Sequence, residues 1–318
     1  MKKRAEIGIN LTLAKTLLEH GKIVSIPTET VYGLAANALN EDAVSEIFRV
    51  KKRPSFDPLI IHTYSLDCLS QFVTEIPEQA ALLAKAFWPG PLTLLLPKKD
   101  IMPDLVTSGL DRVAVRVPNH PFILELLRSL SFPLAAPSAN PFGYISPTQA
   151  EHVADQLGNE IDYILDGGPC EVGVESTIVG WEDGQAIVLR VGGLSVEAIE
   201  KVIGKVHVQA VSSSNPSAPG MLKSHYAPTI PMLAGTIDDL IQEYKGKKIA
   251  VLSFQKAYPE VYKNIILSEN HSTVEAAKHL FAAMRELDKC GADIILTEFV
   301  PEEGLGKAIN DRLRRATS

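Results

Sequence analysis

The chain has 318 residues, of which 46% are hydrophobic and 22% charged, a composition typical of globular proteins that argues against a disordered chain. Its formal net charge of −7 argues against a protein whose whole surface binds nucleic acid, because such surfaces are basic, and restricts any anion site to a local cluster. Its three cysteines lie far apart without a CxxC pair, so we expect neither disulfides nor a cysteine zinc site. The sequence has neither an apolar signal core nor an apolar run of about 18 residues, so we expect a cytoplasmic protein without a membrane span.

Helices and strands are mixed in the first part of the chain, residues 1–205. In chain order, the pattern predicts a helix at 11–22, a strand at 23–27, a helix at 41–52, a strand at 59–63, a helix at 77–88, strands at 91–97 and 112–118, a helix at 121–130, a strand at 133–137, a helix at 147–156, strands at 163–167, 176–181 and 186–193, and a helix at about 195–202. Because these elements do not follow a strict βαβ order, we expect a mixed α/β sheet.

A change of composition separates this part from the rest. Residues 206–228 are rich in serine, proline and small residues, which predicts a linker between a domain at 1–205 and a domain at 229–318. The second domain is predicted to contain a strand at 230–235, a helix at 236–246, a strand at 248–254, a helix near 258–263, a strand at 264–268, a helix at 273–291, a strand at 293–299 and a final helix from about 305. This alternation is typical of a small Rossmann-like domain with a parallel sheet, although no GxGxxG motif follows its first strand to support dinucleotide binding.

The densest group of polar residues is PTETVYG at 27–33, directly after a predicted strand. The hydroxyls of Thr28 and Thr30 and the carboxylate of Glu29 could bind a small polar ligand. The alternative is an ordinary turn whose threonines cap the following element.

Lys51 and Arg53 form a second candidate group at the end of a predicted helix, in KKRPSFDP at 51–58. Two cations held by two prolines suit a polyphosphate, because arginine can bind phosphate bidentately and lysine acts as a point charge. The alternative is a solvated basic helix end that the helix dipole favours.

Three further candidates lie on predicted strands. Arg112 and Arg116 share one strand face, because alternate residues point the same way, and buried cations there would need anionic partners. The alternative is an edge strand with solvated arginines. His62 lies on the strand at 59–63, and a lone strand histidine is more often structural than catalytic.

Small polar residues follow later strands. Ser138 and Asn140, in PSANP at 137–141, stand at a strand end, where α/β folds place ligand contacts, unless they form an Asx-turn. Glu175, Ser176 and Arg190 add polar groups near other strand ends. The sequence has no Walker A motif, HExxH motif or other metal-ligand spacing, so a magnesium ion accompanying a nucleotide would be held largely by phosphate and water.

Taken together, these segments resemble the L-threonylcarbamoyladenylate synthase family, in its two-domain version with a YrdC-like catalytic domain. The matching segments are PTETVYGL at 27–34, KKRP with DPLIIH at 51–62, FWPGPLTLLL at 87–96, VAVRVPNHP at 113–121, PSANPFGYISPT at 137–148, GVESTIVGW at 173–181, LRVGG at 189–193, PGMLKSHYAP at 219–228 and PEEGLGKAINDRLRRA at 301–316. The resemblance covers essentially the whole chain, and the order of the segments makes it specific.

The resemblance implies both an activity and a fold. Members of this family act as nucleotidyltransferases that condense L-threonine, bicarbonate or CO2 and ATP, with Mg2+, into L-threonylcarbamoyl-AMP and pyrophosphate. A partner complex then transfers the threonylcarbamoyl group to the adenosine beside the anticodon of tRNA, and a weak contact with tRNA is also implied. The implied fold is an open, twisted α/β sheet around a deep basic cavity, followed by a Rossmann-like domain.

The resemblance also implies roles for individual residues. The expected threonine contacts are Thr30, His62, Arg116, Ser138 and Ser176. The expected nucleotide contacts are Lys51, Arg53, Asp57, Arg112, Asn140, Thr148 and Arg190, with His225 and Tyr226 of the linker lying over the cavity as a lid. Lys51 and Arg53 are the expected catalytic cations. Asp57 and Arg112 stand where the family usually has asparagine and threonine.

Two other functions remain open on the sequence alone. One is a module that binds double-stranded RNA or tRNA without chemistry, although the negative charge and the retained threonine-contacting residue types argue against it. The other is a carbamoyltransferase, as in related domains of hydrogenase maturation. Those domains occur with acylphosphatase and zinc-finger modules, and this sequence contains neither.

Overall fold

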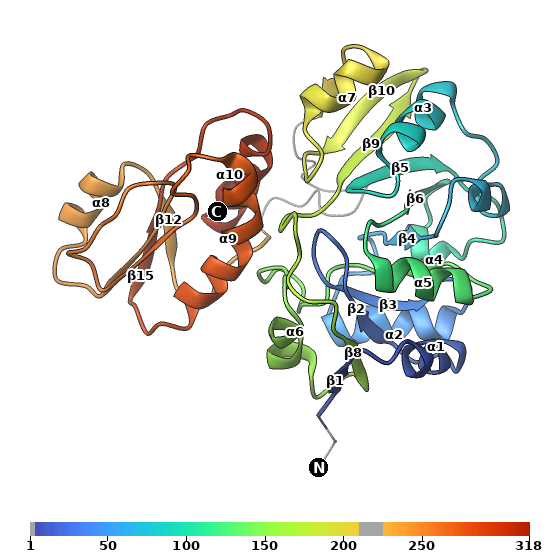
Figure 1. The fold of residues 1–318 in the computed structure, drawn as a ribbon, viewed down its shortest axis with the longest axis horizontal. Coiled ribbons are helices and arrows are strands. Elements are labelled where there is room, and N and C mark those ends of the chain that lie inside the picture. Colours follow the sequence, from blue (N-terminus) through green and yellow to red (C-terminus); the bar gives the residue numbers. More distant parts are fainter. Residues whose placement is uncertain (1–3, 210–224) are drawn as a thin grey trace.

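A computed structural model describes residues 4–209 and 225–318, which form a large mixed sheet and a separate parallel sheet, each flanked by helices (Figure 1). The strands of the large sheet are β1 (Glu6–Gly8), β2 (Val24–Ile26), β3 (Gly33–Asn37), β4 (Ile60–His62), β5 (Leu92–Pro97), β6 (Arg112–Arg116), β7 (Leu134–Ala135), β8 (Tyr163–Leu165), β9 (Thr177–Glu182), β10 (Gln185–Arg190) and β11 (His207–Val208). Its helices are α1 (Leu11–Glu19), α2 (Glu41–Lys51), α3 (Glu78–Phe87), α4 (Asp104–Thr107), α5 (Pro121–Ser129), α6 (Ala150–Leu157) and α7 (Val196–Ile203), with a 3-10 turn at Asp67–Gln71.

The strands of the large sheet follow the order β1-β8-β2-β3-β7-β4-β6-β5-β9-β10-β11. Parallel and antiparallel pairs are interspersed, so the expectation of a mixed sheet is confirmed. The register of β4 and β5 against β6 places His62 and Thr93 on either side of Arg116. Three polar residues from three strands therefore lie in one row across the middle of the sheet.

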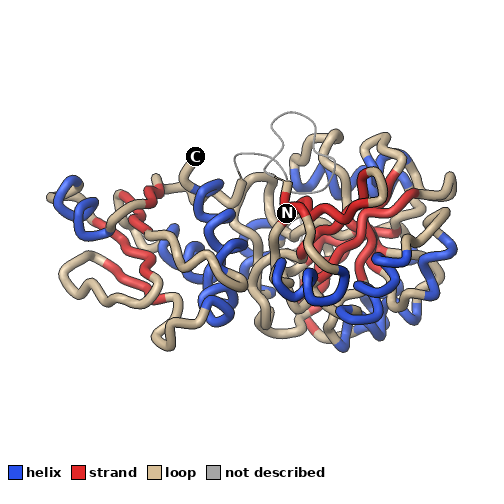
Figure 2. Tube along the Cα trace, turned by 90° about the horizontal axis from the view of Figure 1, so that it is seen from above, coloured by secondary structure: helices blue, strands red, loops and turns tan. Residues whose placement is uncertain are grey.

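The second sheet is built from β12 (Met232–Ala234), β13 (Ile249–Ser253), β14 (Lys263–Ile266) and β15 (Ile294–Thr297), in the order β12-β15-β13-β14. All of its pairs are parallel, as expected for a Rossmann-like domain. Its helices are α8 (Ile237–Glu243), α9 (Thr273–Asp288) and α10 (Gly306–Ala316). Figures 1 and 2 show α9 and α10 between this sheet and the first domain.

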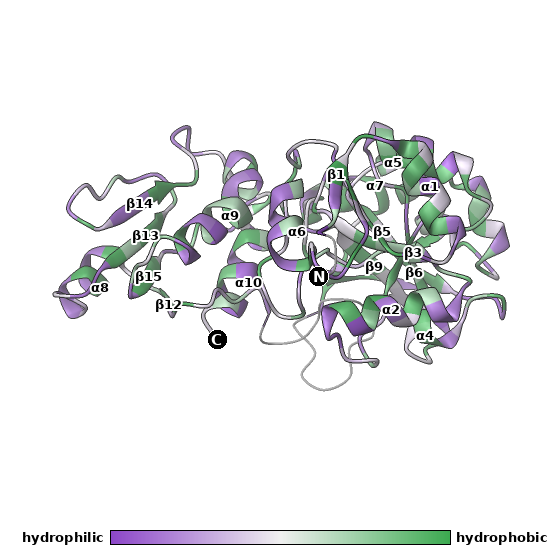
Figure 3. Ribbon diagram, turned by 90° about the horizontal axis from the view of Figure 1, so that it is seen from below, coloured by the Kyte–Doolittle hydropathy of each residue, from purple (hydrophilic) through white to green (hydrophobic). Residues whose placement is uncertain are grey.

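Hydrophobic packing joins the two parts of the chain. One core cluster combines Leu280, Phe281 and Ile309 of the second part with Val31 and Val174 of the first. A larger cluster fills the space between the large sheet and helices such as α2 and α3. Figure 3 shows the central strands mostly hydrophobic and the outer helices carrying hydrophilic stretches, the pattern of a buried sheet under amphipathic helices.

The prediction of a helix near 258–263 is wrong. The chain there makes a turn, in which the Tyr258 N–H donates to the Asn264 side chain at 2.9 Å, and then enters β14 at Lys263. An asparagine that satisfies this backbone donor offers the segment an alternative to a helix.

Several short elements were not expected, among them the 3-10 turn at Asp67–Gln71 and α4. The short strand β1 extends the sheet edge, and β3 (GLAAN) pairs with β2 although glycine and alanine have low strand propensity. Residues 207–208 of the expected linker add β11 beside β10, and residues 210–224 of that linker lie outside the described part of the chain.

Candidate active site

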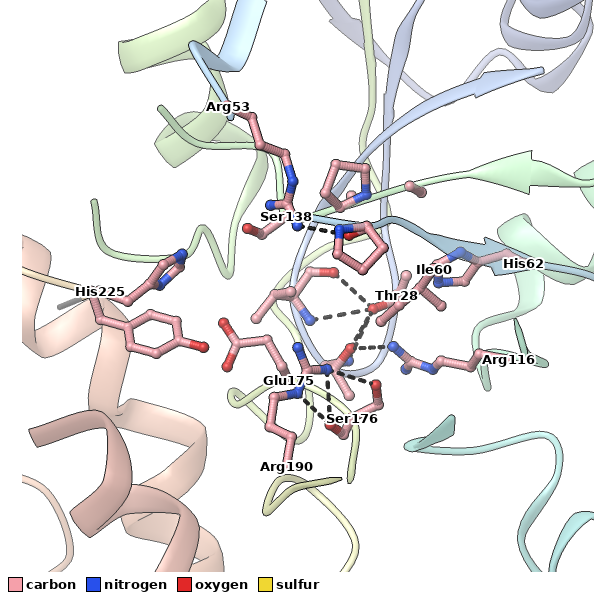
Figure 4. A pocket seen from close by; sticks show the side chains of 17 residues that line it. Thr28, Arg53, Ile60, His62, Arg116, Ser138, Glu175, Ser176, Arg190 and His225 are labelled. Atoms are coloured by element: carbon pink, nitrogen blue, oxygen red, sulfur yellow. Dashed lines mark hydrogen bonds between the residues drawn. The ribbon is translucent and has the colours of Figure 1, made fainter. Parts of the chain in front are cut away.

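A cavity with about 600 Å³ of empty space, counted up to its open mouth, lies over the middle of the large sheet (Figure 4). All five residues expected to contact threonine line it: Thr30, His62, Arg116, Ser138 and Ser176. Of the residues expected on the nucleotide side, Arg53, Arg190, His225 and Tyr226 also line it. Side chains that are up to 196 residues apart in the sequence, from Thr30 to Tyr226, therefore meet at one place.

Arg116 is held at the end of β6 by three groups. Its guanidinium lies 2.7 Å from the Glu29 carboxylate, donates to the Thr30 hydroxyl at 2.8 Å and donates to the Gly90 carbonyl at 3.3 Å. Only 4% of the residue is exposed, so the arginine is fixed in one orientation at the cavity wall. A preset guanidinium of this kind suits the carboxylate of a small ligand.

His62, beside Arg116 in the sheet, is buried and uncharged. Burial, and then the positive charge of Arg116, lower the pKa of His62 to about 3. At neutral pH its imidazole can therefore exchange hydrogen bonds with a ligand but adds no positive charge.

Ser176 connects the threonine side of the cavity to Arg190. The Ser176 hydroxyl lies 2.7 Å from the Thr93 hydroxyl, and Arg190 donates to the Ser176 carbonyl at 2.9 Å and to its hydroxyl at 3.1 Å. Burial lowers the pKa of Arg190 to about 10, so the guanidinium still carries its charge at neutral pH.

Arg53 reaches the cavity from the loop after α2. It forms an ion pair with Asp57 at 2.9 Å and donates to the carbonyls of Asp57 at 3.0 Å and Pro58 at 2.8 Å. Both side chains of the pair are at most 5% exposed. The negative charge of Asp57, in a position where the family usually has a neutral residue, is thus neutralised by Arg53.

Lys51 and Asn140 are buried next to the cavity and do not line it. The Lys51 ammonium donates to the carbonyls of Ser138 and Asn140 at 2.5 Å each, and the Asn140 amide donates to the carbonyl of Tyr144 at 2.7 Å. Burial, and then the charge of Arg53, lower the pKa of Lys51 well below its usual value. These contacts shape the loop that carries Ser138.

Arg112 and Thr148, two more of the expected nucleotide contacts, do not line the central cavity either. Arg112 donates to the Trp181 carbonyl, has a side chain that is 36% exposed, and lines a different cavity with Leu110 and Gly180. The geometry gives no support for a nucleotide contact by Arg112. Thr148 is buried, with no hydrogen-bond partner for its hydroxyl, but it is not among the residues that line the central cavity.

His225 and Tyr226 close one side of the cavity. Their rings meet edge-on at 4.1 Å, and Tyr226 stacks on Phe281 of α9 with ring centroids 5.4 Å apart. Burial lowers the pKa of His225 well below its usual value, and nearby cations, chiefly Arg315, lower it further, so the ring is neutral. Tyr226 is therefore packed against α9 of the second domain at one side of the cavity.

Two family models together match nearly the whole chain. The model described as "Telomere recombination" matches residues 16–192, and the model described as "Threonylcarbamoyl-AMP synthase, C-terminal domain" matches residues 194–318. The threonylcarbamoyl-AMP synthases of Pyrococcus abyssi and Bacillus subtilis are each 44% identical to the chain; the first match covers 96% of this chain and 94% of the relative, and the second covers 95% and 91%. The chain belongs to the threonylcarbamoyl-AMP synthase family.

The fold leads to the same family. The crystal structure of P. abyssi Sua5 in complex with L-threonine is similar to this structure with a TM-score of 0.92 and 43% identity, over 96% of this chain and 94% of that one. The family resemblance and the fold expected from the sequence are therefore confirmed for this threonylcarbamoyl-AMP synthase family member.

Thr28 and Glu175 were noted in the sequence as polar residues near strand ends but received no role from the family resemblance, and Arg312 was not singled out. Glu175 lines the cavity, with one carboxylate oxygen accepting from Ser146 at 2.5 Å and the other from Arg312 of α10 at 3.0 and 3.1 Å. Thr28 accepts the N–H groups of the 28–31 turn and also lines the cavity. The sequence could have indicated Arg312, because the tail at 301–316 matches two-domain members and its arginines lie among apolar residues at helical spacing.

The carboxylates around the cavity are already paired with arginines. Glu29 pairs with Arg116, as Asp57 does with Arg53 and Glu175 with Arg312. In residues 4–209 and 225–318, no three histidine, cysteine or acidic side chains cluster in a way that could hold a metal ion. A divalent ion that enters with a nucleotide would therefore be bound mainly by phosphate and water. Within the same residues, no helix has the length and apolar character needed to cross a membrane.

Proposed function

We propose that this chain is an L-threonylcarbamoyladenylate synthase, which condenses L-threonine, bicarbonate or CO2 and ATP into L-threonylcarbamoyl-AMP and pyrophosphate. The observation that carries the proposal is the meeting of Arg53, Arg116 and Arg190 with the hydroxyls of Thr30 and Ser176 in one cavity. Such a site can gather two anionic substrates. The relatives named threonylcarbamoyl-AMP synthase and the similar Sua5 structure with L-threonine support the same assignment.

The threonine side of the site lies along the end of β6. The Arg116 guanidinium would bind the substrate carboxylate, since it is preset by Glu29 and Thr30. Hydroxyls of Ser138 and Ser176, with neutral His62, would bind the remaining polar groups. The nucleotide side would use Arg53 and Arg190 for the phosphates, with His225 and Tyr226 against the nucleoside. Lys51, Asp57, Asn140 and Thr148 would support the nucleotide side from behind the cavity wall, and Mg2+ would accompany ATP.

The reaction needs positioning and electrostatics, and no protein nucleophile. The threonine amine adds to CO2, loses a proton and becomes an N-carboxylate. An oxygen of that carboxylate attacks the α-phosphorus of ATP, the bond to the bridging oxygen breaks, and pyrophosphate leaves. Two anions must approach each other, so fixed cations such as Arg53 and Arg190 lower the barrier by offsetting the repulsion.

One assay tests the proposed function. The purified chain is incubated with ATP, Mg2+, bicarbonate and L-threonine, and pyrophosphate release and the AMP-linked product are measured. We expect both to depend on threonine and to be much weaker with serine, which lacks the methyl group. Pyrophosphate release that ignores the amino acid, or no product, would refute the proposal.

The two alternative functions predict other results. An RNA-binding module would bind tRNA with a steep salt dependence and show no threonine-dependent use of ATP. A carbamoyltransferase would consume carbamoyl phosphate. The buried pairing of the cavity carboxylates and the family membership favour the synthase. We further propose that the product passes to a complex that modifies tRNA, with at most a weak tRNA contact by this chain, and that these steps take place in the cytoplasm.

We also propose that residues 206–228, between domains at 1–205 and 229–318, act as a lid. His225 and Tyr226, at the end of this segment, line the cavity, and Tyr226 packs on Phe281 of α9. Residues 210–224 lie outside the described part of the chain. Deleting residues 219–228 should raise the Michaelis constant for ATP and lower turnover, because the nucleotide loses a wall and water enters. Unchanged values of both constants in the deletion variant would show that the segment is only a tether.

A further inference from the structure

The wall of the cavity includes a carboxylate that is neutralised from the other domain. Glu175 lines the cavity two residues before β9, and its partner Arg312 lies on α10 with no exposed side-chain surface. The two nitrogens Nε and Nη2 of Arg312 donate to one Glu175 oxygen at 3.1 and 3.0 Å. The third, Nη1, donates to the Val191 carbonyl at 2.6 Å. All three nitrogens of Arg312 thus donate to residues of the first domain. Nη1 also donates to the carboxylate of Asp311, on the same helix, at 2.8 Å.

The same arginine supports a second cavity residue. The Arg312 guanidinium lies over the Tyr226 ring at 5.4 Å from the ring centroid, and Arg315 lies over that ring at 4.8 Å. Tyr226 is 1% exposed and lines the cavity. Arg312 therefore contacts two residues of the cavity wall that come from different parts of the chain, and none of its own atoms lines the cavity.

We propose that Arg312 is a positioning residue, which holds Glu175 and Tyr226 at the cavity wall so that the C-terminal domain completes the active site. This inference rests on the proposed function for the identity of the ligand, ATP. It gives the C-terminal domain a defined task in nucleotide binding.

The ion pair controls the side chain of Glu175 more than its backbone. The Gly193 N–H donates to the Glu175 carbonyl at 2.8 Å, and a Cβ on Gly192 would lie 2.3 Å from that carbonyl oxygen, so the backbone is fixed by close packing. Without Arg312, the carboxylate would keep its place in the chain but lose its counter-charge. An uncompensated carboxylate beside a bound triphosphate repels it, and a buried unpaired charge is costly in itself.

Charge also makes the role testable by pH. The groups that face Glu175 are Arg312 from α10, Arg190 from β10, Tyr226, and Ser146 before α6, while Asp311 faces Arg312. Burial acts to raise the pKa of Glu175, but Arg312, then Arg190 and Ser146, hold that pKa below its usual value. Removing Arg312 leaves burial less opposed, so the pKa of Glu175 should rise. The carboxyl would then be neutral at lower pH and become an unpaired anion as the pH increases.

The experiment compares four proteins: the wild type, Arg312→Met, the double variant Arg312→Met with Glu175→Gln, and the control Arg314→Met. Arg314 lies on the same helix, but its side chain is 54% exposed and pairs with Glu302 at the surface. For each protein, the dissociation constant of Mg-ATP is measured by calorimetry at several pH values between about pH 6 and about pH 8. The Michaelis constants for ATP and threonine and the thermal unfolding temperature are measured alongside.

We expect Arg312→Met to weaken Mg-ATP binding by about tenfold or more, with the loss growing as the pH rises. The double variant should recover most of the affinity and lose the pH dependence, because neither charge remains. Arg314→Met should match the wild type. Equal ATP affinity in Arg312→Met and Arg314→Met would overturn the proposal, as would a double variant that is folded but no better than the single one. Because binding is measured without turnover, a wild type that binds Mg-ATP but makes no adenylate would refute the proposed function and still test Arg312.

Discussion

Replacing Arg53 by alanine should lower kcat/KM for ATP by about two to three orders of magnitude, since a charged contact in a closed site is worth about 2–5 kcal/mol. The guanidinium lines the cavity and is already fixed by Asp57 and by the Pro58 carbonyl. A cation that is fixed before the triphosphate arrives needs no reorganisation during the reaction, which makes its charge more effective than a mobile one. Threonine-dependent pyrophosphate release measures the loss.

The matched variants separate charge from folding. Arg53→Ala leaves Asp57 buried and unpaired, so part of its effect could be instability. The double variant Arg53→Gln with Asp57→Asn removes both charges; we expect it to unfold near the wild-type temperature and to remain inactive. Arg49→Ala, on α2 but paired with Glu46 at the surface, should keep full activity. If the double variant turned over within about tenfold of the wild type, Arg53 would not carry the triphosphate charge.

The sequence predicted those elements whose hydrophobic pattern is strong and local. The strand expected at 91–97 is β5 (Leu92–Pro97), and the helix expected at 41–52 is α2 (Glu41–Lys51). It did not predict β3, because GLAAN has neither β-branched nor aromatic residues and is a strand only through its pairing with β2 and β7. The strand order could not be predicted either, since the two-residue strand β7 lies between β3 and β4 through register alone.

In the candidate site, the sequence could indicate some of the residues but not their contact partners. Residue types at strand ends, such as Thr30, Ser138 and Ser176, could be selected from the sequence together with the family resemblance. Their partners could not, because the contact of Glu175 with Arg312 spans 137 positions and depends on how the two domains pack. Alternation correctly placed Arg112 and Arg116 on one strand, but four residues of extended chain separate them by about 13 Å, and Arg112 lines a different cavity from Arg116. Alternation predicts which face of a strand a side chain lies on, but it does not predict which position along the strand lies next to the cavity.

Lys51 shows a further limit of residue type as a guide. A lysine before a proline-rich turn suggested a phosphate contact, yet its ammonium is bonded to the carbonyls of Ser138 and Asn140. Two carbonyl acceptors of a loop far along the chain cannot be seen from the local sequence. The contacts of the lysine give it a part in holding the loop at 137–141.

Replacing Arg116 should have the other large effect, and on threonine more than on ATP. We expect Arg116→Gln to raise the Michaelis constant for threonine by about a hundredfold, the value of a charge-assisted pair of hydrogen bonds to a carboxylate, while the constant for ATP changes little. Arg116→Lys should recover only part of the loss, because an ammonium keeps the charge but not the fork that meets two oxygens. Steady-state kinetics with each substrate varied in turn measures both constants.

The control must remove the partner as well. Glu29 lies 2.7 Å from the Arg116 guanidinium, and both side chains are 5% exposed, so Arg116→Gln alone leaves a buried carboxylate unpaired at the threonine site. The double variant Arg116→Gln with Glu29→Gln removes that charge and should restore the thermal stability without restoring threonine affinity. If it restored both, the loss in the single variant would come from the unpaired buried charge of Glu29, and Arg116 would serve to neutralise that carboxylate instead of binding the substrate. The kinetics of the double variant thus decide which anion, Glu29 or threonine, the arginine is there to hold.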